Sequence, residues 1–246
     1  MTLLLPLSLF GAAAVSAFLY WASQSHRLHR PRDLRFTTPP REYEYEDSSP
    51  TWACTYVRPL LERYLRALPP GSRVLDLGCG NGAMLGSFYG RGYQLVGVDV
   101  SNSGIKQARE RWPDIRFEVR DVTQELSDLG QFDAIINTEV IEHVFLPRDL
   151  VRNCFHLLKP GGILVLSTPY HGYLRNLAIA VTNHTDTHFN PLFDYGHIKF
   201  WSVDTLSKLL WQAGFEDLEY IGGAGRIRVP YLWTGFVTFA RKSVER

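Results

Sequence analysis

Five short apolar runs, separated by segments of helical character, constrain the fold of this chain more than any other feature. Each run has the length and composition of a buried strand, and the runs are "RVLDLG", "YQLVGVDV", "IRFEV", "FDAIINT" and "ILVLST". Several segments between them are helical over roughly ten residues, among them "GAMLGSFYG" (82–90), "SGIKQARERW" and "PRDLVRNCFHLL". We expect "KPGG" to end the last of these helices. Strands joined by crossover helices form a parallel sheet that helices cover on both faces. We therefore expect an α/β protein.

The same domain continues on both sides of this alternation. Apolar residues recur at helical spacing from Trp52 to Leu68, and "PPGS" ends that helix. "SVDTLSKLLWQAGF" predicts an amphipathic helix, and "EDLEYIG" and "WTGFVTFAR" predict two closing strands. One domain over residues 52–242 accounts for all these segments.

Residues 1–22 have a different character. Leu3 to Trp21 include no charged residue and are about long enough to cross the hydrocarbon core of a bilayer as a helix. Basic residues follow this run and none precedes it, which is unlike a secretory signal, the alternative interpretation. We expect an N-terminal hydrophobic anchor helix, transmembrane or interfacial, and then an irregular linker over residues 23–51. The positive-inside rule places the domain on the cytoplasmic, or matrix-equivalent, face of the membrane.

Charge and cysteine content argue against some classes of protein. The formal net charge of +1 disfavours a nucleic-acid-binding protein that works by bulk phosphate neutralisation. Cys54, Cys79 and Cys154 form no closely spaced pair, which disfavours both a disulfide framework and a cysteine-ligated zinc site.

A glycine-rich turn follows the first strand. "VLDLGCGNGA" places Gly78, Gly80 and Gly82 where the backbone can approach a ligand, although a tight strand-to-helix turn without a ligand has the same pattern. Asp76 disfavours a dinucleotide, because a carboxylate beside the turn would repel pyrophosphate in a poorly screened cleft. S-adenosylmethionine (SAM), which carries an ammonium and a sulfonium group, would be attracted instead.

Two further acids follow the next two strands. Asp99 ends the second strand, where a carboxylate can accept both ribose hydroxyls. Asp121 follows the third strand, and its position there predicts a contact with the adenine amino group. A lone aspartate at such a position would instead be typical of a helix cap.

Five motifs occur in the order in which class I SAM-dependent methyltransferases have them. "VLDLGCGNG", "VGVDVS", "RDV", "FDAIINTEVIEHV" and "LLKPGGILVLSTP" resemble that family densely over residues 70–170 and loosely over 200–242. The resemblance implies a Rossmann-like, seven-stranded, mostly parallel sheet with an antiparallel last strand. The residues it implies for SAM binding are Asp76, Gly78, Cys79, Gly80, Asn81, Gly82, Asp99, Val100, Asp121, Val122, Thr138 and Glu139.

Within that family, "EVIEHV" and "STPYHGYLRNLAIA" are similar to the O-methyltransferases of ubiquinone biosynthesis. The matching Glu139, Glu142 and His143 are implied to bind a divalent cation, with Mg²⁺ expected and Zn²⁺ the weaker alternative. A metal there would lower the pKa of a phenol, and His143, beside Glu142, is the expected general base. A metal-free base at His143, and a Glu139 that only lines the cofactor, remain alternatives.

A long insertion, residues 169–200, follows the fifth strand. Tyr173, Leu174, Leu177 and Val181 form an apolar stretch that could lie in a bilayer interface or form a lid over the active site. The insertion also contains four histidines whose spacing matches no standard metal-binding pattern, so we expect them at the surface or in the substrate pocket: His171, His184, His188 and His197.

Taken together, these features predict a SAM-dependent O-methyltransferase. The expected acceptor is a lipophilic phenol or catechol, such as a polyprenyl quinone precursor, and the expected partners are the membrane and a multi-enzyme biosynthetic complex. One alternative is a metal-free methyltransferase that acts on a thiol, a sugar or a lipid head group. Another is a non-catalytic SAM-binding subunit of a membrane complex. Residues 36–55 do not resemble the entry segment of the quinone enzymes, which leaves the acceptor open.

Overall fold

The computed structural model describes residues 42–222 and 233–244. The predicted anchor, residues 1–22, and residues 23–41 of the predicted linker lie outside the described residues. Within the described ranges, no helix has both the length and the apolar character needed to cross a membrane.

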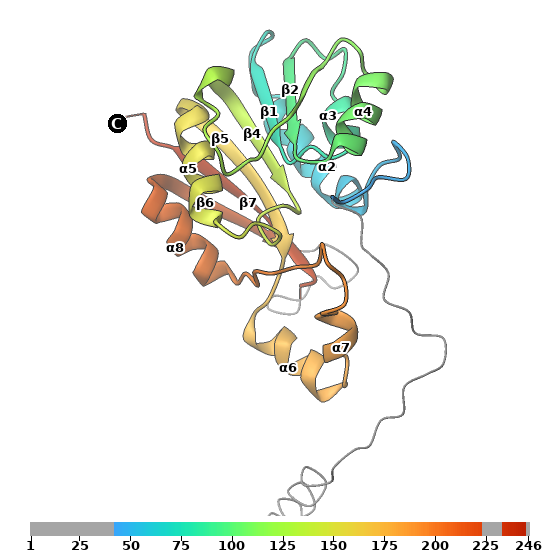
Figure 1. The fold of residues 1–246 in the computed structure, drawn as a ribbon. Coiled ribbons are helices and arrows are strands. Elements are labelled where there is room, and N and C mark those ends of the chain that lie inside the picture. Colours follow the sequence, from blue (N-terminus) through green and yellow to red (C-terminus); the bar gives the residue numbers. More distant parts are fainter. Residues whose placement is uncertain (1–41, 223–232, 245–246) are drawn as a thin grey trace, which may run out of the picture. The chain divides into compact units, whose positions relative to one another are not determined.

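A seven-stranded sheet forms the centre of the fold (Figure 1). The strand order is β3-β2-β1-β4-β5-β7-β6. The first five strands are parallel, and β7 is antiparallel to both of its neighbours, which confirms the predicted sheet. The strands are β1 (Arg73–Leu77), β2 (Gln94–Asp99), β3 (Arg116–Val119), β4 (Phe132–Thr138), β5 (Leu158–Pro169), β6 (Phe215–Gly222) and β7 (Gly235–Lys242).

Helices cover both faces of the sheet, as parallel strands require. One face packs against α2 (Trp52–Leu65), α3 (Ala83–Gly86) and α4 (Asn102–Arg111). The other packs against α5 (Pro147–Leu157), α8 (Val203–Ala213) and the short 3₁₀ helix η1 (Ser127–Leu129). The insertion forms α6 (Tyr173–Val181) and α7 (Thr185–His188), which lie beyond the arrowheads of β4 and β5 in Figure 1.

The apolar side chains form two clusters, one on each face of the sheet. Alternate residues of β1 separate in this way, because Leu75 and Leu77 join the cluster under α5 and α8 while Val74 joins the cluster under α2 and α4. Such a separation follows from the two-residue period of a strand.

Two predicted boundaries differ from the structure. "KPGG", which the sequence suggested as the end of a helix, belongs to β5, where Lys159 pairs with Asp133 at 2.8 Å and Gly161 takes a φ of +76°. The helix predicted over 82–90 is only four residues long, since Gly86 leaves room for the Trp112 ring and Gly90 takes a φ of +74°. Both differences arise at glycines, which favour turns and irregular backbone.

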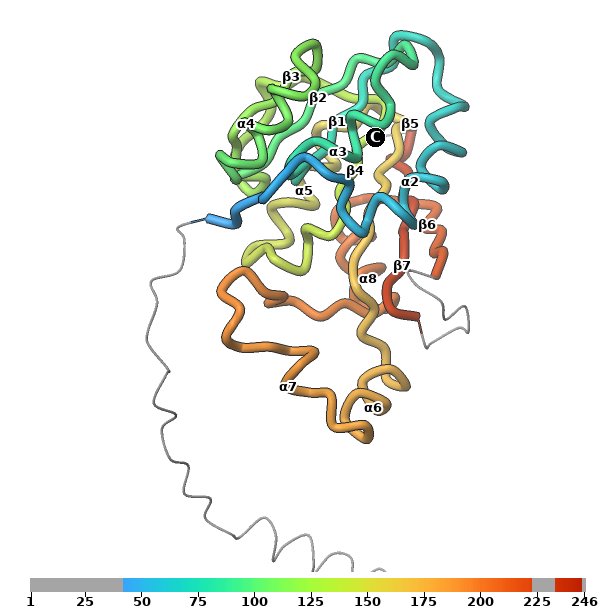
Figure 2. The backbone as a smooth tube through the Cα atoms, turned by 90° about the vertical axis from the view of Figure 1, so that its right-hand side faces the viewer, coloured from blue at the N-terminus to red at the C-terminus, as the bar shows by residue number. Residues whose placement is uncertain are grey.

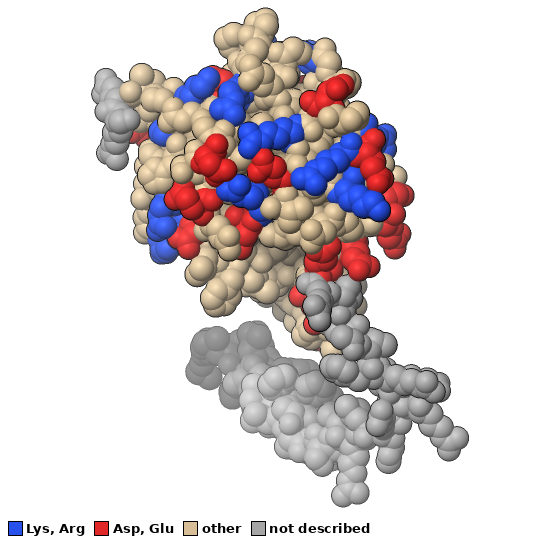
Figure 3. Space-filling model, turned by 45° about the horizontal axis from the view of Figure 1, so that its top comes forward, with Lys and Arg blue, Asp and Glu red and all other residues tan. Residues whose placement is uncertain are grey.

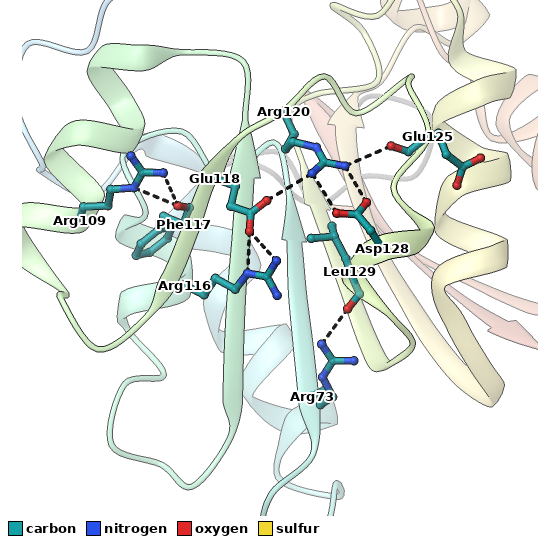
Figure 4. Close-up of polar contacts among 9 residues, drawn as sticks. All are labelled: Arg73, Arg109, Arg116, Phe117, Glu118, Arg120, Glu125, Asp128 and Leu129. Atoms are coloured by element: carbon teal, nitrogen blue, oxygen red, sulfur yellow. Dashed lines mark hydrogen bonds and ion pairs between the residues drawn. The ribbon is translucent and has the colours of Figure 1, made fainter.

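Polar contacts fix the connection that follows β3 (Figure 4). Arg120 forms an ion pair with Asp128 at 2.7 Å and a longer one, 3.4 Å, with Glu118. Arg73 of β1 donates to the carbonyl of Leu129 at 2.8 Å. These contacts join the loop at residues 120–129 to the sheet, and Asp121 lies in that loop.

Candidate active site

Four acidic residues lie at the carboxyl edge of the parallel strands. Asp76 is in β1, Asp99 ends β2, Asp121 follows β3 and Glu139 follows β4. The carboxyl edge is where α/β sheets of this kind bind ligands. The structure therefore brings the predicted acids to one edge, although they are far apart in the sequence.

Asp76 is a buried carboxyl group without a partner. Its exposed fraction is 0%, and neither carboxylate oxygen has a hydrogen-bond partner among the described residues. Burial, together with the charge of Asp99, raises the pKa of Asp76 to about 8. A buried, unsatisfied carboxylate is costly unless a ligand completes its hydrogen bonds, so this position suits a cationic ligand group.

The glycine-rich turn has the backbone that its sequence predicts. Gly78, Gly80 and Gly82 all have positive φ angles, of +86°, +54° and +74°. The Gly80 N–H donates to Asp99 Oδ2 at 2.8 Å, and the Ser101 N–H donates to Asp99 Oδ1 at 2.8 Å. These bonds fix the Asp99 carboxylate beside the turn, while burial raises its pKa.

The residues around Asp99 and Asp121 differ in exposure. Val100 is 55% exposed directly after β2, where an apolar ring could pack on it, while Val122 is buried in the core. Asp121 Oδ1 accepts two bonds from Thr123, one from its N–H at 2.8 Å and one from its hydroxyl at 2.7 Å. Asp121 thus stabilises a turn with one oxygen, but no helix begins there, so it is not the helix cap that the alternative suggested. Its role toward adenine stays a prediction.

Residues 42–50, which we call the N-terminal strap, pack against the glycine turn and α4 (Figure 2). They have no regular secondary structure, as predicted for this end of the linker. The Tyr45 ring lies over Gly80 and Gly104, at positions that a side chain on either glycine would occupy. The Tyr45 N–H donates to Ser103 Oγ at 3.1 Å, and Gln107 donates to the Tyr45 carbonyl at 2.6 Å.

Two of the predicted cofactor residues have structural contacts instead. The Asn81 side-chain amide donates to the carbonyls of Asp47 and Ser49, both at 2.9 Å, so it holds the N-terminal strap. The Cys79 side chain is buried in the core beside Gly97. Either residue can still contact a ligand through its backbone.

Glu139 has an unusual backbone and two hydrogen-bond donors. Its φ is +54°, a conformation that costs a non-glycine residue of order 1 kcal/mol and that clusters at functional sites. Tyr56 and Ser167 donate their hydroxyl protons to Glu139 Oε1, at 2.5 and 2.8 Å. Thr138, the preceding residue, pairs with Ser167 in the sheet. Tyr56 and Ser167 had no signal in the sequence, because they come from distant elements.

Glu142 and His143 lie next to His197. A carboxylate oxygen and one ring nitrogen from each histidine lie within 4.8 Å of one another. Glu142 is 1% exposed; Thr168 donates to its Oε2 at 2.9 Å, and its Oε1 has no partner among the described residues. Burial and the charge of Glu139 raise the pKa of Glu142 well above its usual value.

The group differs from the predicted metal set, since His197 takes part and Glu139 does not. His197 comes close because Ile198 and Lys199 donate their backbone N–H groups to the Glu142 carbonyl, at 2.8 and 3.0 Å. The sequence could not indicate this contact across the insertion.

His143 is placed to accept a proton. Its Nδ1 lies 3.2 Å from the Gly196 carbonyl oxygen, so the tautomer that donates from Nδ1 leaves Nε2 with a free lone pair. Nε2 lies 4.0 Å from Glu142 Oε1. Burial lowers the pKa of His143, which keeps the ring neutral near pH 7.

Comparison with known proteins places the chain in a family. Residues 51–220 match a family model described as a methyltransferase domain. A ubiquinone biosynthesis O-methyltransferase of Dinoroseobacter shibae is 34% identical over 157 residues, which cover 62% of this chain and 63% of that protein. A protein of the same description from Xanthomonas axonopodis is 40% identical over 108 residues, 42% of this chain and 45% of that protein. The chain thus spans less than two thirds of the length of these relatives.

Solved structures share the fold at low identity. A methyltransferase from Bacillus halodurans superposes with a TM-score of 0.59 at 18% identity, over 77% of this chain and 99% of that one. A phosphoethanolamine N-methyltransferase of Haemonchus contortus, solved with SAM, gives a TM-score of 0.59 at 16% identity, over 76% of this chain and 52% of that one.

Proposed function

The chain belongs to the family of methyltransferase domains, and we propose that it transfers the methyl group of SAM to a hydroxyl oxygen of a lipophilic phenol or catechol, such as a polyprenyl quinone precursor. The observation that supports this most directly is the position of two groups at one edge of the sheet. Asp76 offers an unpaired carboxylate to the donor, and His143 offers an unprotonated ring nitrogen to the acceptor. The names of the relatives support an oxygen acceptor.

The residues at the carboxyl edge fit SAM. The unsatisfied Asp76 carboxylate matches an ammonium group, and the left-handed turn at Gly78, Gly80 and Gly82 lets the backbone approach a ligand. Asp99, held by two N–H donors, is placed to accept ribose hydroxyls. When bound, SAM supplies a methyl group that its sulfonium makes electrophilic.

The protein's own part in the reaction is to orient the acceptor and move one proton. A phenol has a pKa near 10 and is a weak nucleophile until it loses its proton. In the proposed step, His143 Nε2 takes the hydroxyl proton while an oxygen lone pair forms the new O–C bond. The methyl–sulfur bond breaks with its electrons going to sulfur, which yields S-adenosylhomocysteine, the methyl ether and an imidazolium that returns its proton to solvent.

The donors near His143 fit Mg²⁺ poorly. Mg²⁺ prefers oxygen ligands in a regular octahedron, and this group offers one carboxylate and two imidazoles. The proposed step therefore uses no Mg²⁺. The same donors match ligands that Zn²⁺ takes, so the experiment has to separate a metal-free base from a zinc site.

The test measures S-adenosylhomocysteine formation and the mass of the methylated product with catechol and SAM. We expect His143→Ala to lower kcat by about 100-fold or more without changing SAM affinity, and we expect wild-type activity to survive a chelator. His156→Ala, at an exposed histidine of α5, is the matched control and should retain activity.

Two results would contradict the proposal. Bound SAM without turnover on catechol or on any hydroxylated lipid from membrane extracts would exclude the transferase activity. Loss of activity with a chelator and its return with Zn²⁺ would show that a bound zinc ion, and not a metal-free His143, activates the acceptor hydroxyl.

The exposed face of α6 supports a further part of the proposal, contact with a membrane in which the acceptor dissolves. Tyr173 and Val181 are 79% and 77% exposed, and Leu174 and Leu177 lie on the same side of the helix. Exposed apolar patches of this kind mark interaction sites. The double variant Leu177→Glu, Val181→Glu should lower methylation of a vesicle-embedded catechol but not of soluble catechol. Val244→Glu, at another exposed valine, is the control; equal losses on both substrates would contradict membrane contact.

A further inference from the structure

A second polar cluster lies in the insertion, outside the residues used so far. We call it the insertion cluster, and it consists of His171, Arg175 and His188. His171 follows β5, Arg175 is in α6 and His188 is in α7. The rings of His171 and His188 lie 5.2 Å apart, between centroids. Arg175 is on the side of α6 opposite the exposed apolar residues, since it is half-buried while Tyr173 and Leu177 are exposed.

The cluster has buried polar atoms that await a partner. Three nitrogens have no hydrogen-bond partner among the described residues, and they are His171 Nε2, His188 Nε2 and Arg175 Nε. His171 as a whole is only 7% exposed, and its other ring nitrogen lies 3.2 Å from Asn176 Oδ1. Buried polar groups are normally paired, so three unpaired nitrogens in one place indicate a missing ligand.

The cluster also lacks a counter-charge. Arg175 forms no ion pair with any residue in the described ranges, and burial is the sole cause that lowers its pKa. Burial lowers the pKa of His171, and the neighbours that shift this pKa in either direction are Asn176, His188, Arg175 and His197, none of which is an acid. A guanidinium partly removed from water, beside two imidazoles, favours an anion.

The insertion cluster lies beside the proposed methyl-transfer site. His197 connects the two, because it interacts electrostatically with both His188 and His143, and its ring centroid lies 4.8 Å from that of His143. The start and the end of the insertion also meet, since the His171 N–H donates to the Trp201 carbonyl at 2.7 Å. One small molecule could therefore reach from His143 to the cluster.

We propose that His171, Arg175 and His188 bind an anionic group, of carboxylate chemistry, on the methyl acceptor while its hydroxyl lies at His143. This inference rests on the proposed function and adds the acceptor's charge to it. Arg175 supplies the fixed positive charge. Contact with the anion draws protons from solvent onto the imidazoles, so that both ring nitrogens then donate.

The test compares two soluble probes that differ by one carboxylate, 3,4-dihydroxybenzoate and catechol, on the full chain with SAM. We expect wild-type kcat/KM to favour 3,4-dihydroxybenzoate by about 10- to 100-fold, the range expected for charge-assisted hydrogen bonds. Arg175→Gln should raise KM for 3,4-dihydroxybenzoate by a similar factor, leave its kcat nearly unchanged and leave both parameters for catechol unaltered.

Three further variants test whether the insertion cluster binds the carboxylate. His188→Asn, at a partly exposed position, should reduce the preference in the same direction, and Arg175→Lys should restore part of it because the charge returns. Arg152→Gln is the matched control, since Arg152 is 61% exposed on α5 and pairs with Asp149. That variant should keep the wild-type preference.

Binding without turnover separates this inference from the proposed function. Calorimetry with benzoate and S-adenosylhomocysteine should show Arg175-dependent binding even if neither probe is methylated; in that case the anion site stands and the O-methyltransferase proposal falls. Equal use of both probes by the wild type, or equal losses on both in Arg175→Gln, would overturn the anion site. If Arg175→Gln keeps the preference but no longer binds phosphatidylglycerol vesicles, the anion is a lipid phosphate and the inference is wrong.

Discussion

Asp76 is the residue whose environment should change most when a ligand arrives. In the structure it is fully buried, unpaired and placed near Asp99, which together with burial raises its pKa to about 8. An ammonium group beside it would stabilise the carboxylate and lower that pKa. Binding of a cationic ligand at neutral pH therefore releases a proton.

The sign of the pH dependence follows from this proton. Only the deprotonated Asp76 attracts the ammonium, so the affinity for SAM should fall about tenfold for each pH unit below about 8. Calorimetry between pH 6 and 9 measures the slope. Methylthioadenosine, which lacks the ammonium, is the control ligand and should bind independently of pH in this range.

The variant Asp76→Asn completes this prediction. It should bind SAM no better than methylthioadenosine and should lose the pH dependence. A slope that persists in Asp76→Asn would assign the proton to another group, and the electrostatic account of Asp76 would be wrong.

Single site residues could be predicted from the sequence where the position of a residue at the end of a strand determines its role. The carboxyl ends of the parallel strands predicted three acids as site residues, namely Asp76, Asp99 and Glu139. The structure places all three at one edge of the sheet. Tyr45 and Tyr56 were missed as site residues, and His197 was predicted only as a surface or substrate-pocket histidine, because these residues come close to the site only when segments 35 to 111 positions away have folded. No local pattern encodes such contacts.

Among the elements, the N-terminal strap is bonded to the glycine-rich turn by the side chain of Asn81. Asn81 donates to the carbonyls of Asp47 and Ser49, and its own Oδ1 accepts from the Ala83 N–H. Asn81→Asp keeps that acceptor but replaces the two donors by an oxygen that faces two carbonyl oxygens. We expect the strap to detach, and hydrogen exchange of the Tyr45 amide, now bonded to Ser103, to accelerate about tenfold or more.

A second asparagine offers a matched control for this prediction. Asn153 bridges the carbonyls of Val122 and Gln124 in the same way, but in a different part of the chain. Asn153→Asp should leave exchange at Tyr45 unchanged. Similar acceleration in both variants would indicate a general loss of stability instead of a released strap.

Helix α8 has a capping box that sets its start. Ser202 Oγ accepts from the Thr205 N–H, and the Thr205 hydroxyl accepts from the Ser202 N–H. Ser202→Ala should lower the free energy of unfolding by about 1 kcal/mol, and Ser202→Asp should retain most of it, because aspartate also caps helices.

Urea denaturation measures both α8 variants. Ser127→Ala, at an exposed serine of η1, should change the free energy of unfolding by less than about 0.5 kcal/mol. If Ser202→Ala behaves like that control, the cap contributes nothing to the fold.

The elements themselves were largely predictable, and their ends were less so. Periodicity identified α4, α5, α8 and all seven strands, since burial imposes a distinct period on each type of element. The four-residue α3 and the long β5 were not predicted with their true bounds, because glycines there permit several conformations and tertiary packing selects one.

For the molecule as a whole, the two cores depend on large side chains that meet the sheet. Phe236 of β7 is fully buried in the cluster under α5 and α8. Phe236→Ala should lower the free energy of unfolding by about 3–5 kcal/mol, as expected for a phenylalanine removed from a packed core. Phe145→Ala, at a residue that is 76% exposed, should cost about 1 kcal/mol or less.

Urea denaturation decides between a strongly and a weakly packed β7. If Phe236→Ala lowers the free energy of unfolding by less than about 1 kcal/mol, as the control does, this strand contributes little to the core. The strand order could be predicted from the resemblance to a known fold, but the pairing of Phe236 with Thr168 could not, since register depends on the whole sheet.

The surface carries positive and negative side chains in a mixture, as the small net charge of the sequence suggests. On the face shown in Figure 3, Lys and Arg residues alternate with Asp and Glu residues over the upper part of the molecule in Figure 1. Alternating signs produce a weak field at a distance, so a charged acceptor would be attracted only close to the protein.

The position of β7 between β5 and β6 has a consequence for synthesis on the ribosome. A nascent chain that has emerged as far as residue 222 holds the strand sequence of β6 but not the strand against which β6 pairs, so both β6 and the edge of β5 are left open. Open strand edges recruit other chains. The few seconds between the emergence of β6 and that of β7 are thus the period in which this protein most needs a chaperone.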